Sequence, residues 1–258
     1  MKKSVKAKPR VKRPARKAKR PVRKVKRPVR KVARSAPMPK RAPKQESADA
    51  LAKRAAAVFA ALVKEYPKAG CELDFHHPFE LVVATILSAQ CTDKRVNMVM
   101  PSVMARYPNA AALAHADRGE LEQLITSTGF FRNKAKSLVG MARAITDHYG
   151  GQVPATMEDL VALPGVGRKT ANVVLGNAFN INEGVVVDTH VARLSNRLAF
   201  TRATDPVKIE QDLIPLFPRD QWTMLAHLLI WHGRRVCDAR KPRCGDCVVA
   251  KLCPSRVL

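Results

Sequence analysis

From Ser47 onward, apolar residues recur at intervals of three and four positions, the spacing that places them on one face of a helix. Capping and turn residues divide this pattern into segments. Ser47 precedes an alanine-rich segment that stops near Tyr66, and Pro78 suits a first helical turn. Short apolar runs such as residues 81–83 also suit strands, but their neighbours keep the helical spacing. The expected helices cover residues 47–66, 79–90, 92–107, 117–126, 133–148, 157–162, 168–174, 189–198, 206–216 and 220–236. No hairpin pattern accompanies them, so the predicted fold class is all-α.

Two of the expected helices are joined by a tight turn with the sequence Leu163-Pro164-Gly165-Val166-Gly167. Thr156 and the acidic residues after it resemble a capping box at the start of the first helix. Glycine permits positive φ and lets another backbone approach closely. Successive N–H groups beside a helix N-terminus can hold a phosphate oxygen. The turn alone does not distinguish such a phosphate site from an ordinary helix connection.

Positive charge is concentrated at the N-terminus. The chain has 258 residues and a net charge of +26, and residues 1–44 hold 21 of its 47 Lys and Arg with no acid. The remainder holds 26 basic and 21 acidic side chains. Repeated prolines and like charges prevent a packed core, so residues 1–46 are predicted to form a disordered basic tail. The tail suits a nucleic-acid tether that acts by counterion release. A targeting peptide and a solvated tail without a specific role are alternatives.

A chain of this length can bury one or two sizeable cores. No apolar run reaches the roughly 20 residues that span a bilayer. The N-terminus also lacks the apolar stretch of a secretory signal. We therefore expect a cytoplasmic protein without a membrane partner.

Four of the six cysteines lie within the last 22 residues, in the sequence CDARKPRCGDCVVAKLC. Pro242 and Gly245 force turns between them, so their thiols are expected to converge on one small volume. Two disulfides and a zinc site are both possible, but structural zinc sites usually join two ligand pairs through a longer spacer. One compact loop with four thiolates suits a [4Fe–4S] cluster better. The predicted ligands are Cys237, Cys244, Cys247 and Cys253.

The segments LPGVGRKTAN and VDTHV, together with the spacing C-x6-C-x2-C-x5-C, resemble the endonuclease III family of the helix-hairpin-helix DNA glycosylase superfamily. Residues 87–93 and 128–135 also match family segments, and the resemblance covers about residues 48–254. It implies a monomeric bacterial repair enzyme, associated with the nucleoid, that acts on double-stranded DNA carrying an oxidised pyrimidine or an abasic site. It further implies a two-lobed fold with the active-site cleft between the lobes. One lobe would be a six-helix domain, 71–183, and the other would combine 47–70 with 184–258 around the [4Fe–4S] cluster.

The resemblance assigns the catalytic roles to Lys169 and Asp188. Lys169 follows the glycine turn, where the positive helix end and a mostly buried cleft would disfavour a charged ammonium. Its amine would displace the base, form a Schiff base with the sugar, and lead to β-elimination on the 3′ side of the abasic site. Asp188 would stabilise charge on the sugar or move protons. Without the resemblance, Lys169 also suits a phosphate contact, and Asp188 suits a helix N-cap.

The same resemblance suggests which residues contact DNA. Gly165, Val166 and Gly167 would bind a phosphate, and Gln90, Phe130 and His190 would fill or support the gap left by the flipped nucleotide. Phe130 departs from the Leu of the best-known relatives, but either side chain can intercalate. Arg132, together with its neighbours Asn133 and Lys134, is a candidate for contact with the DNA backbone, or else simply an exposed helix start.

Three other functions are compatible with parts of this pattern. An adenine-specific mismatch glycosylase needs a catalytic Glu before Gln90, where Thr85, Ile86 and Leu87 stand instead. A monofunctional mismatch glycosylase would lack Lys169. A non-catalytic helix-hairpin-helix DNA-binding protein would need neither Lys169 nor Asp188.

Overall fold

The computed structural model describes residues 46–257, and the predicted N-terminal tail lies outside these residues except for Glu46. The described part of the chain is helical and contains no strand, which confirms the all-α class. None of its helices combines the length and the apolar character that crossing a bilayer requires. The α-helices are α1 (Ala48–Glu65), α2 (Pro78–Ser88), α3 (Asp93–Arg106), α4 (Ala110–Ala114), α5 (Arg118–Ile125), α6 (Phe131–Tyr149), α7 (Met157–Ala162), α8 (Arg168–Ala178), α9 (Thr189–Arg197), α10 (Pro206–Leu213) and α11 (Trp222–Arg235). Short 3-10 turns are η1 (Thr126–Thr128), η2 (Ile214–Leu216), η3 (Arg219–Gln221), η4 (Cys244–Asp246) and η5 (Ala250–Leu252).

Side-chain caps start most of these helices where the sequence predicts them. Ser47 accepts a hydrogen bond from the Ala50 amide at 3.2 Å, and Thr156 accepts one from the Asp159 amide at 3.2 Å. Each such cap satisfies a helix N–H that has no partner within the helix and contributes about 1 kcal/mol. The boundaries predicted from capping residues are therefore close to those observed.

The expected end of α8 at residue 174 was too early, since the helix continues to Ala178. Two other predicted boundaries were also wrong, and they share one reason. Helix α2 ends at Ser88 rather than Gln90, and α6 begins at Phe131 rather than Asn133. Gln90 and Phe130 have φ values of 54° and 49°, in the left-handed region that residues other than glycine seldom adopt. These conformations interrupt the helical hydrogen bonds. The short α4, which begins at its Asn109 cap, was not predicted, because five residues are too few to show a periodic pattern.

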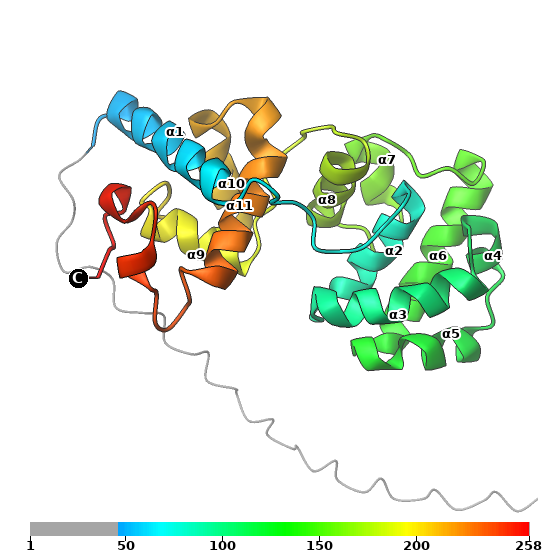
Figure 1. Cartoon of the computed structure of the whole chain (residues 1–258). Coiled ribbons are helices and arrows are strands. Elements are labelled where there is room, and N and C mark those ends of the chain that lie inside the picture. Colours follow the sequence, from blue (N-terminus) through cyan, green and yellow to red (C-terminus); the bar gives the residue numbers. More distant parts are fainter. Residues whose placement is uncertain (1–45, 258) are drawn as a thin grey trace, which may run out of the picture. The chain divides into compact units, whose positions relative to one another are not determined.

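The buried apolar side chains form two clusters. The helices that carry them form two groups, α2 to α8 and α1 with α9 to α11 (Figure 1). The first runs from Leu73 to Leu175 and is built by α2 to α8. The second combines α1 with the extended segment Val185-Val186-Val187 and with α9, α10 and α11. Fully buried leucines and isoleucines dominate the first cluster, and each contributes roughly 1.5–3 kcal/mol by leaving water.

Direct contacts join the two clusters, and all described residues belong to one compact unit. Gly176 in α8 lies so close to α11 that an added Cβ would be 2.3 Å from Thr223 Oγ1. The Asn182 side-chain oxygen accepts a hydrogen bond from the Thr223 amide at 3.0 Å. Arg168 at the start of α8 donates to Glu210 in α10 at 2.9 Å. These contacts fix the start of α8 against the second cluster.

Candidate active site and cysteine loop

The glycine turn connects α7 to α8, and no side chain caps the first amides of α8. Gly165 has a φ of 81°, and an added Cβ there would lie 2.6 Å from the Ser137 Cβ in α6. The Val166 amide closes the turn by donating to the Leu163 carbonyl at 3.1 Å, and the Val166 side chain is buried. Gly167 has ordinary extended φ and serves as the N-cap of α8. Of the two glycines, Gly165 is therefore the one that needs left-handed backbone.

Lys169 lies in the first turn of α8, two residues beyond Gly167, and it is exposed. The sequence predicted a mostly buried cleft at this position, and for the protein without DNA this was wrong. The turn projects its polar face outward while Val166 and Ala171 point into the core. Exclusion of water from Lys169 therefore has to come from a bound partner.

Asp188 follows the buried segment 185–187 and caps α9. One carboxylate oxygen, Oδ1, accepts from the amides of both His190 and Val191 at 2.8 Å. Within residues 46–257, Oδ2 has no hydrogen-bond partner. Asp188 therefore has the predicted capping role through Oδ1, and Oδ2 remains able to accept a proton or contact a substrate.

Asp93, at the start of α3, is a further carboxylate beside these residues that the sequence did not single out. Burial raises the pKa of Asp93, and the negative charge of Asp188 raises it further. The positive charge of Lys169 acts in the opposite direction, as does His190 when it is protonated. Lys169, Asp188 and His190 therefore all lie within electrostatic range of Asp93, although they come from three separate segments of the chain.

A solvent-open cavity of about 740 Å³ adjoins this group. Asp93, Asn97 and Met98 from α3 line it together with His190 from α9 and Arg234 from α11. Arg234 forms an ion pair with Asp93 at 2.8 Å. The cavity is therefore lined by helices that contribute to both hydrophobic clusters.

His190 is oriented by a second residue of its own helix. Arg193 Nη2 lies 3.1 Å from His190 Nδ1 and also donates to the Gly233 carbonyl at 2.9 Å. Because a guanidinium can only donate, Nδ1 is the acceptor and Nε2 is the nitrogen that carries the proton. His190 can thus present an N–H donor to the cavity.

Gln90 and Phe130 each stand at a left-handed turn directly before a helix or its cap. Both are exposed, and the Phe130 side chain is 63% exposed, unusually high for an aromatic residue. An exposed apolar side chain of this size on a constrained turn can insert between bases. Arg132 is also exposed, and its guanidinium lies 4.9 Å from the centre of the Phe131 ring.

Lys134, which the sequence grouped with Arg132 as a possible DNA contact, is buried. It is 5% exposed, and its ammonium donates to the carbonyls of Leu87 at 2.7 Å and Thr128 at 2.8 Å. The prediction of a backbone contact for Lys134 was therefore wrong. Helical rotation explains the error, because Lys134 is on the inward face of α6 beside Ala135 and Leu138.

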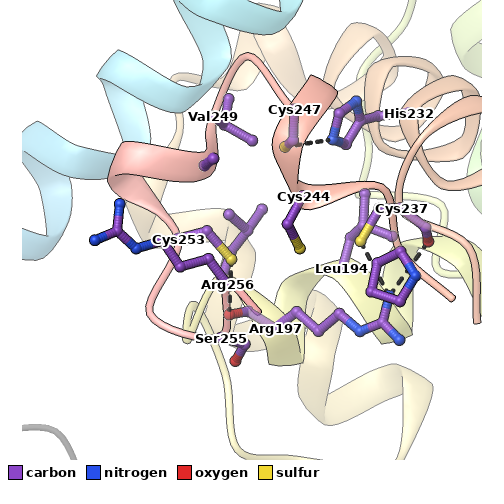
Figure 2. Close-up of a pocket in the computed structure, with 13 residues that line it drawn as sticks. Leu194, Arg197, His232, Cys237, Cys244, Cys247, Val249, Cys253, Ser255 and Arg256 are labelled. Carbon is purple, nitrogen blue, oxygen red and sulfur yellow. Dashed lines mark hydrogen bonds between the residues drawn. The ribbon is translucent and has the colours of Figure 1, made fainter. Parts of the chain in front are cut away.

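The four C-terminal cysteines line one cavity between their loop and α9 (Figure 2). All four are partly buried free thiols that face the space between Leu194, Arg197 and His232. Within the described residues, no three His, Cys, Asp or Glu side chains are placed to hold a single metal ion. A ring of thiols around a wider space suits a four-iron cluster, whose iron atoms are each bound by one cysteine.

The surroundings of the thiols also suit a cluster. Burial raises the pKa of the Cys247 and Cys253 thiols, so binding of iron is needed to keep them as thiolates. Burial lowers the pKa of His232 to about 4. Neutral His232 accepts from the Tyr66 hydroxyl at Nδ1, which leaves Nε2–H to donate to the Cys247 sulfur at 3.2 Å (Figure 2). Arg197 donates to the Cys237 sulfur at 3.1 Å.

These supporting residues were not recognised from the sequence. Nothing in the local sequence around His232, Asp93, Arg197 or Arg234 indicates their contacts. Each of them acts on a residue far away in the chain, which single-sequence spacing does not reveal.

Comparison with known proteins agrees with this arrangement. The family model described as "HhH-GPD superfamily base excision DNA repair protein" matches residues 83–219. The model described as "Iron-sulfur binding domain of endonuclease III" matches residues 237–253. This second match begins and ends at cysteines of the C-terminal loop.

Similar proteins cover most of the chain. Endonuclease III of Synechocystis sp. is 58% identical over 202 residues, which is 78% of this chain and 92% of that protein. A solved non-covalent endonuclease III–DNA complex is 39% identical, with a TM-score of 0.75 over 79% of this chain and 95% of the other. A trapped endonuclease III–DNA covalent intermediate is also 39% identical, with a TM-score of 0.75 over 79% of this chain and 96% of the other.

Family membership and the cofactor follow from these matches together with the geometry. The cysteine loop is an iron–sulfur binding segment, and its cofactor is a [4Fe–4S] cluster. The chain belongs to the endonuclease III family of helix-hairpin-helix base excision DNA repair proteins.

Proposed function

We propose that this protein is a bifunctional DNA glycosylase and abasic-site lyase with Lys169 as its nucleophile. The observation that carries the proposal is the position of Lys169. It is two residues beyond the glycine turn, in the first turn of α8, and within electrostatic range of Asp93 beside Asp188 and His190. A monofunctional glycosylase or a DNA-binding protein needs no amine in this position.

The substrate is double-stranded DNA with an oxidised pyrimidine or an abasic site. A base inside a duplex has to leave the stack before its sugar can be attacked. Phe130 and Gln90 are exposed at rigid turns and fill the gap, and the N–H of His190 supports the displaced nucleotide. The cavity of about 740 Å³ beside His190 takes the flipped base.

The reaction follows from the chemistry of an amine at a sugar carbon. The Lys169 nitrogen forms a bond to C1′, and the bond from C1′ to the base breaks as the base leaves with a proton. The bond from C1′ to the ring oxygen O4′ then breaks as O4′ takes up a proton, which opens the sugar and leaves a Schiff base between C1′ and the Lys169 nitrogen. This Schiff base makes a C2′ proton acidic. Loss of that proton breaks the bond to the 3′ phosphate, and water then hydrolyses the imine. Asp188 Oδ2 stabilises positive charge on the sugar and moves protons.

The glycine turn holds one phosphate so that Lys169 meets one particular sugar. Gly167 caps α8 without a side-chain hydrogen bond, which leaves the first amides of the helix to bind a phosphate, and the helix end carries partial positive charge. Bound DNA also covers Lys169 and supplies the exclusion of water that the free protein lacks. Arg132, exposed at the start of α6, contacts the DNA backbone.

The four cysteines of the C-terminal loop are proposed as the cluster ligands. Their thiolates would hold the cluster, which would tie the loop together. The loop also carries exposed basic side chains that can approach DNA, namely Arg240, Lys241, Arg243 and Lys251.

The proposal also covers the two domains, the basic tail and the location of the protein. The proposed domain 71–183 surrounds the first hydrophobic cluster, and the cluster domain, 47–70 plus 184–258, surrounds the second. The first domain holds seven α-helices, α2 to α8, where six were expected. The tail, 1–46, tethers the protein to DNA through its charge. The protein acts as a monomer in the bacterial cytoplasm, in association with the nucleoid, and bacterial relatives such as the Synechocystis protein support this location.

Borohydride trapping tests the proposed chemistry. Incubation of the protein with a thymine-glycol duplex and sodium borohydride is expected to give a covalent protein–DNA adduct, because borohydride reduces the Schiff base. The adduct is measured as a shifted band on a denaturing gel. A protein that removes the base without forming any adduct is monofunctional, and the proposal would then be wrong.

The Gly165→Ala variant tests the phosphate-binding turn. Left-handed backbone and the contact with Ser137 both oppose the new Cβ, so the turn is expected to move and DNA affinity to fall by about tenfold. Affinity is measured by fluorescence anisotropy with an undamaged duplex. Gly150→Ala is the matched control, because Gly150 has a φ of 59° and nothing within 4 Å of an added Cβ. Equal loss of affinity in both variants would argue against the turn as the anchor.

A further inference from the structure

Lys134 is a buried cation without a carboxylate partner in the described residues. Its ammonium donates to two backbone carbonyls, Leu87 O at 2.7 Å and Thr128 O at 2.8 Å. Leu87 is in the last turn of α2, where free helix carbonyls carry partial negative charge. Thr128 is itself 2% exposed and ends η1. Burial lowers the pKa of Lys134, and a negative charge on Cys91 acts in the opposite direction.

The two carbonyls belong to the two turns that carry the exposed DNA-facing residues. Leu87 is three residues before Gln90, and Thr128 is two residues before Phe130. Both Gln90 and Phe130 have left-handed backbone. This conformation costs energy and persists only where contacts with the surrounding structure offset the cost. The ammonium is a single group that contacts both turns, so it fixes the distance between them.

We propose that Lys134 is a positioning residue that sets the spacing of Gln90 and Phe130, so that both can enter the duplex at one gap. The inference rests on the proposed function, because it assigns the geometry of the two residues that fill this gap. It gives Lys134 no contact with the substrate. An apolar side chain of similar length would fill the same space but leave both carbonyls without a hydrogen bond.

Comparison of two substrates shows whether the Lys134→Met variant loses the positioning of Gln90 and Phe130 or the reaction at Lys169. Excision of thymine glycol from a duplex needs the gap to be filled, whereas cleavage of a single-stranded abasic oligonucleotide needs only Lys169 and its neighbours. Duplex excision under single-turnover conditions is expected to fall about 10- to 100-fold, and single-stranded cleavage by less than about threefold. Lys136→Met is the matched control, since Lys136 loses the same charge on the exposed face of the same helix. It is expected to keep the wild-type ratio of the two rates.

A double-mutant cycle tests whether the effect passes through the two turns. In a Gln90→Ala, Phe130→Ala background, Lys134→Met is expected to lower duplex excision by less than about twofold, because no inserted side chains remain to be positioned. A general loss of stability would instead add its full effect in this background. Equal loss of both activities in the single variant, or full additivity in the cycle, overturns the inference.

If the Lys134→Met variant does not fold, amide hydrogen exchange on the wild-type protein tests the inference instead. The amides of Cys91 and Gly129 donate within the two turns, at 3.0 Å and 3.2 Å. We expect both to be protected in the free protein and unchanged when DNA with a reduced abasic site binds. Protection that arises only on binding would show that the turns are not held in advance, and would overturn the inference. Failure of wild-type protein to form the borohydride adduct would instead refute the proposed function.

Discussion

The Lys169→Ala variant is expected to give no borohydride adduct and to lose strand cleavage at abasic sites by about 10⁴-fold or more. The amine is the atom that bonds to C1′, and no other group of the described site can replace it as the nucleophile. Lys169 is exposed and does not pack in the core, so the variant is expected to fold normally. The measurement is adduct formation and single-turnover cleavage on a duplex with one abasic site.

Two further variants separate the nucleophile from a phosphate contact at the same position. Lys169→Arg keeps a positive charge at the start of α8, so it is expected to retain DNA affinity but to form no adduct. Lys208→Ala removes an exposed lysine from the first turn of another helix, α10, and is expected to behave as wild type. An undiminished adduct in Lys169→Ala would show that a different amine is the nucleophile.

The Asp188→Asn variant is expected to fold with nearly wild-type stability and to excise damaged bases about 10²- to 10⁴-fold more slowly. Asparagine is as good an N-cap as aspartate, so the hydrogen bonds from the His190 and Val191 amides are preserved. The charge of the second oxygen is lost, and with it the stabilisation of the cationic sugar. Single-turnover excision and thermal unfolding are the two measurements.

The cap of α10 supplies a matched control for this variant. Asp205 Oδ1 accepts from the amides of Val207 and Lys208 at 3.1 Å, the same geometry as at Asp188. Asp205→Asn is therefore expected to change neither stability nor excision. Asp188→Ala removes the cap as well as the charge, and should lower the free energy of unfolding by about 1 kcal/mol more than Asp188→Asn. If Asp188→Asn excised as fast as wild type, Asp188 would be a cap alone.

Asp93 is coupled electrostatically to Asp188, so substitution of either residue changes the environment of the other. Its carboxyl is half-buried and pairs with Arg234. Its pKa depends on the charges of Asp188 and Lys169, and on that of His190 when it is protonated. Removal of the Asp188 charge takes away one cause of the raised Asp93 pKa. Effects of Asp188 and Asp93 substitutions are therefore not expected to be additive.

Much of the local structure could be predicted because it depends on neighbours in the chain. The caps at Ser47, Thr156 and Asp188 use hydrogen bonds that span two or three residues. The turn at Gly165 and the cysteine spacing are likewise local. The helix ends at Gln90 and Phe130 were misplaced, because a left-handed residue other than glycine has no signature in the sequence.

The sequence by itself determined most of the helices, the glycine turn that precedes Lys169, and the cysteine loop that suits a [4Fe–4S] cluster. Only the tertiary structure decided which side chains are buried and which charged groups lie close enough to shift each other's pKa. Lys134 contacts a carbonyl 47 residues away, and Asp93 comes from a different helix than Lys169 and Asp188. The physical reason is that hydrogen bonds within a turn depend on local spacing, whereas the burial and charge environment of a side chain depend on segments that only folding brings together.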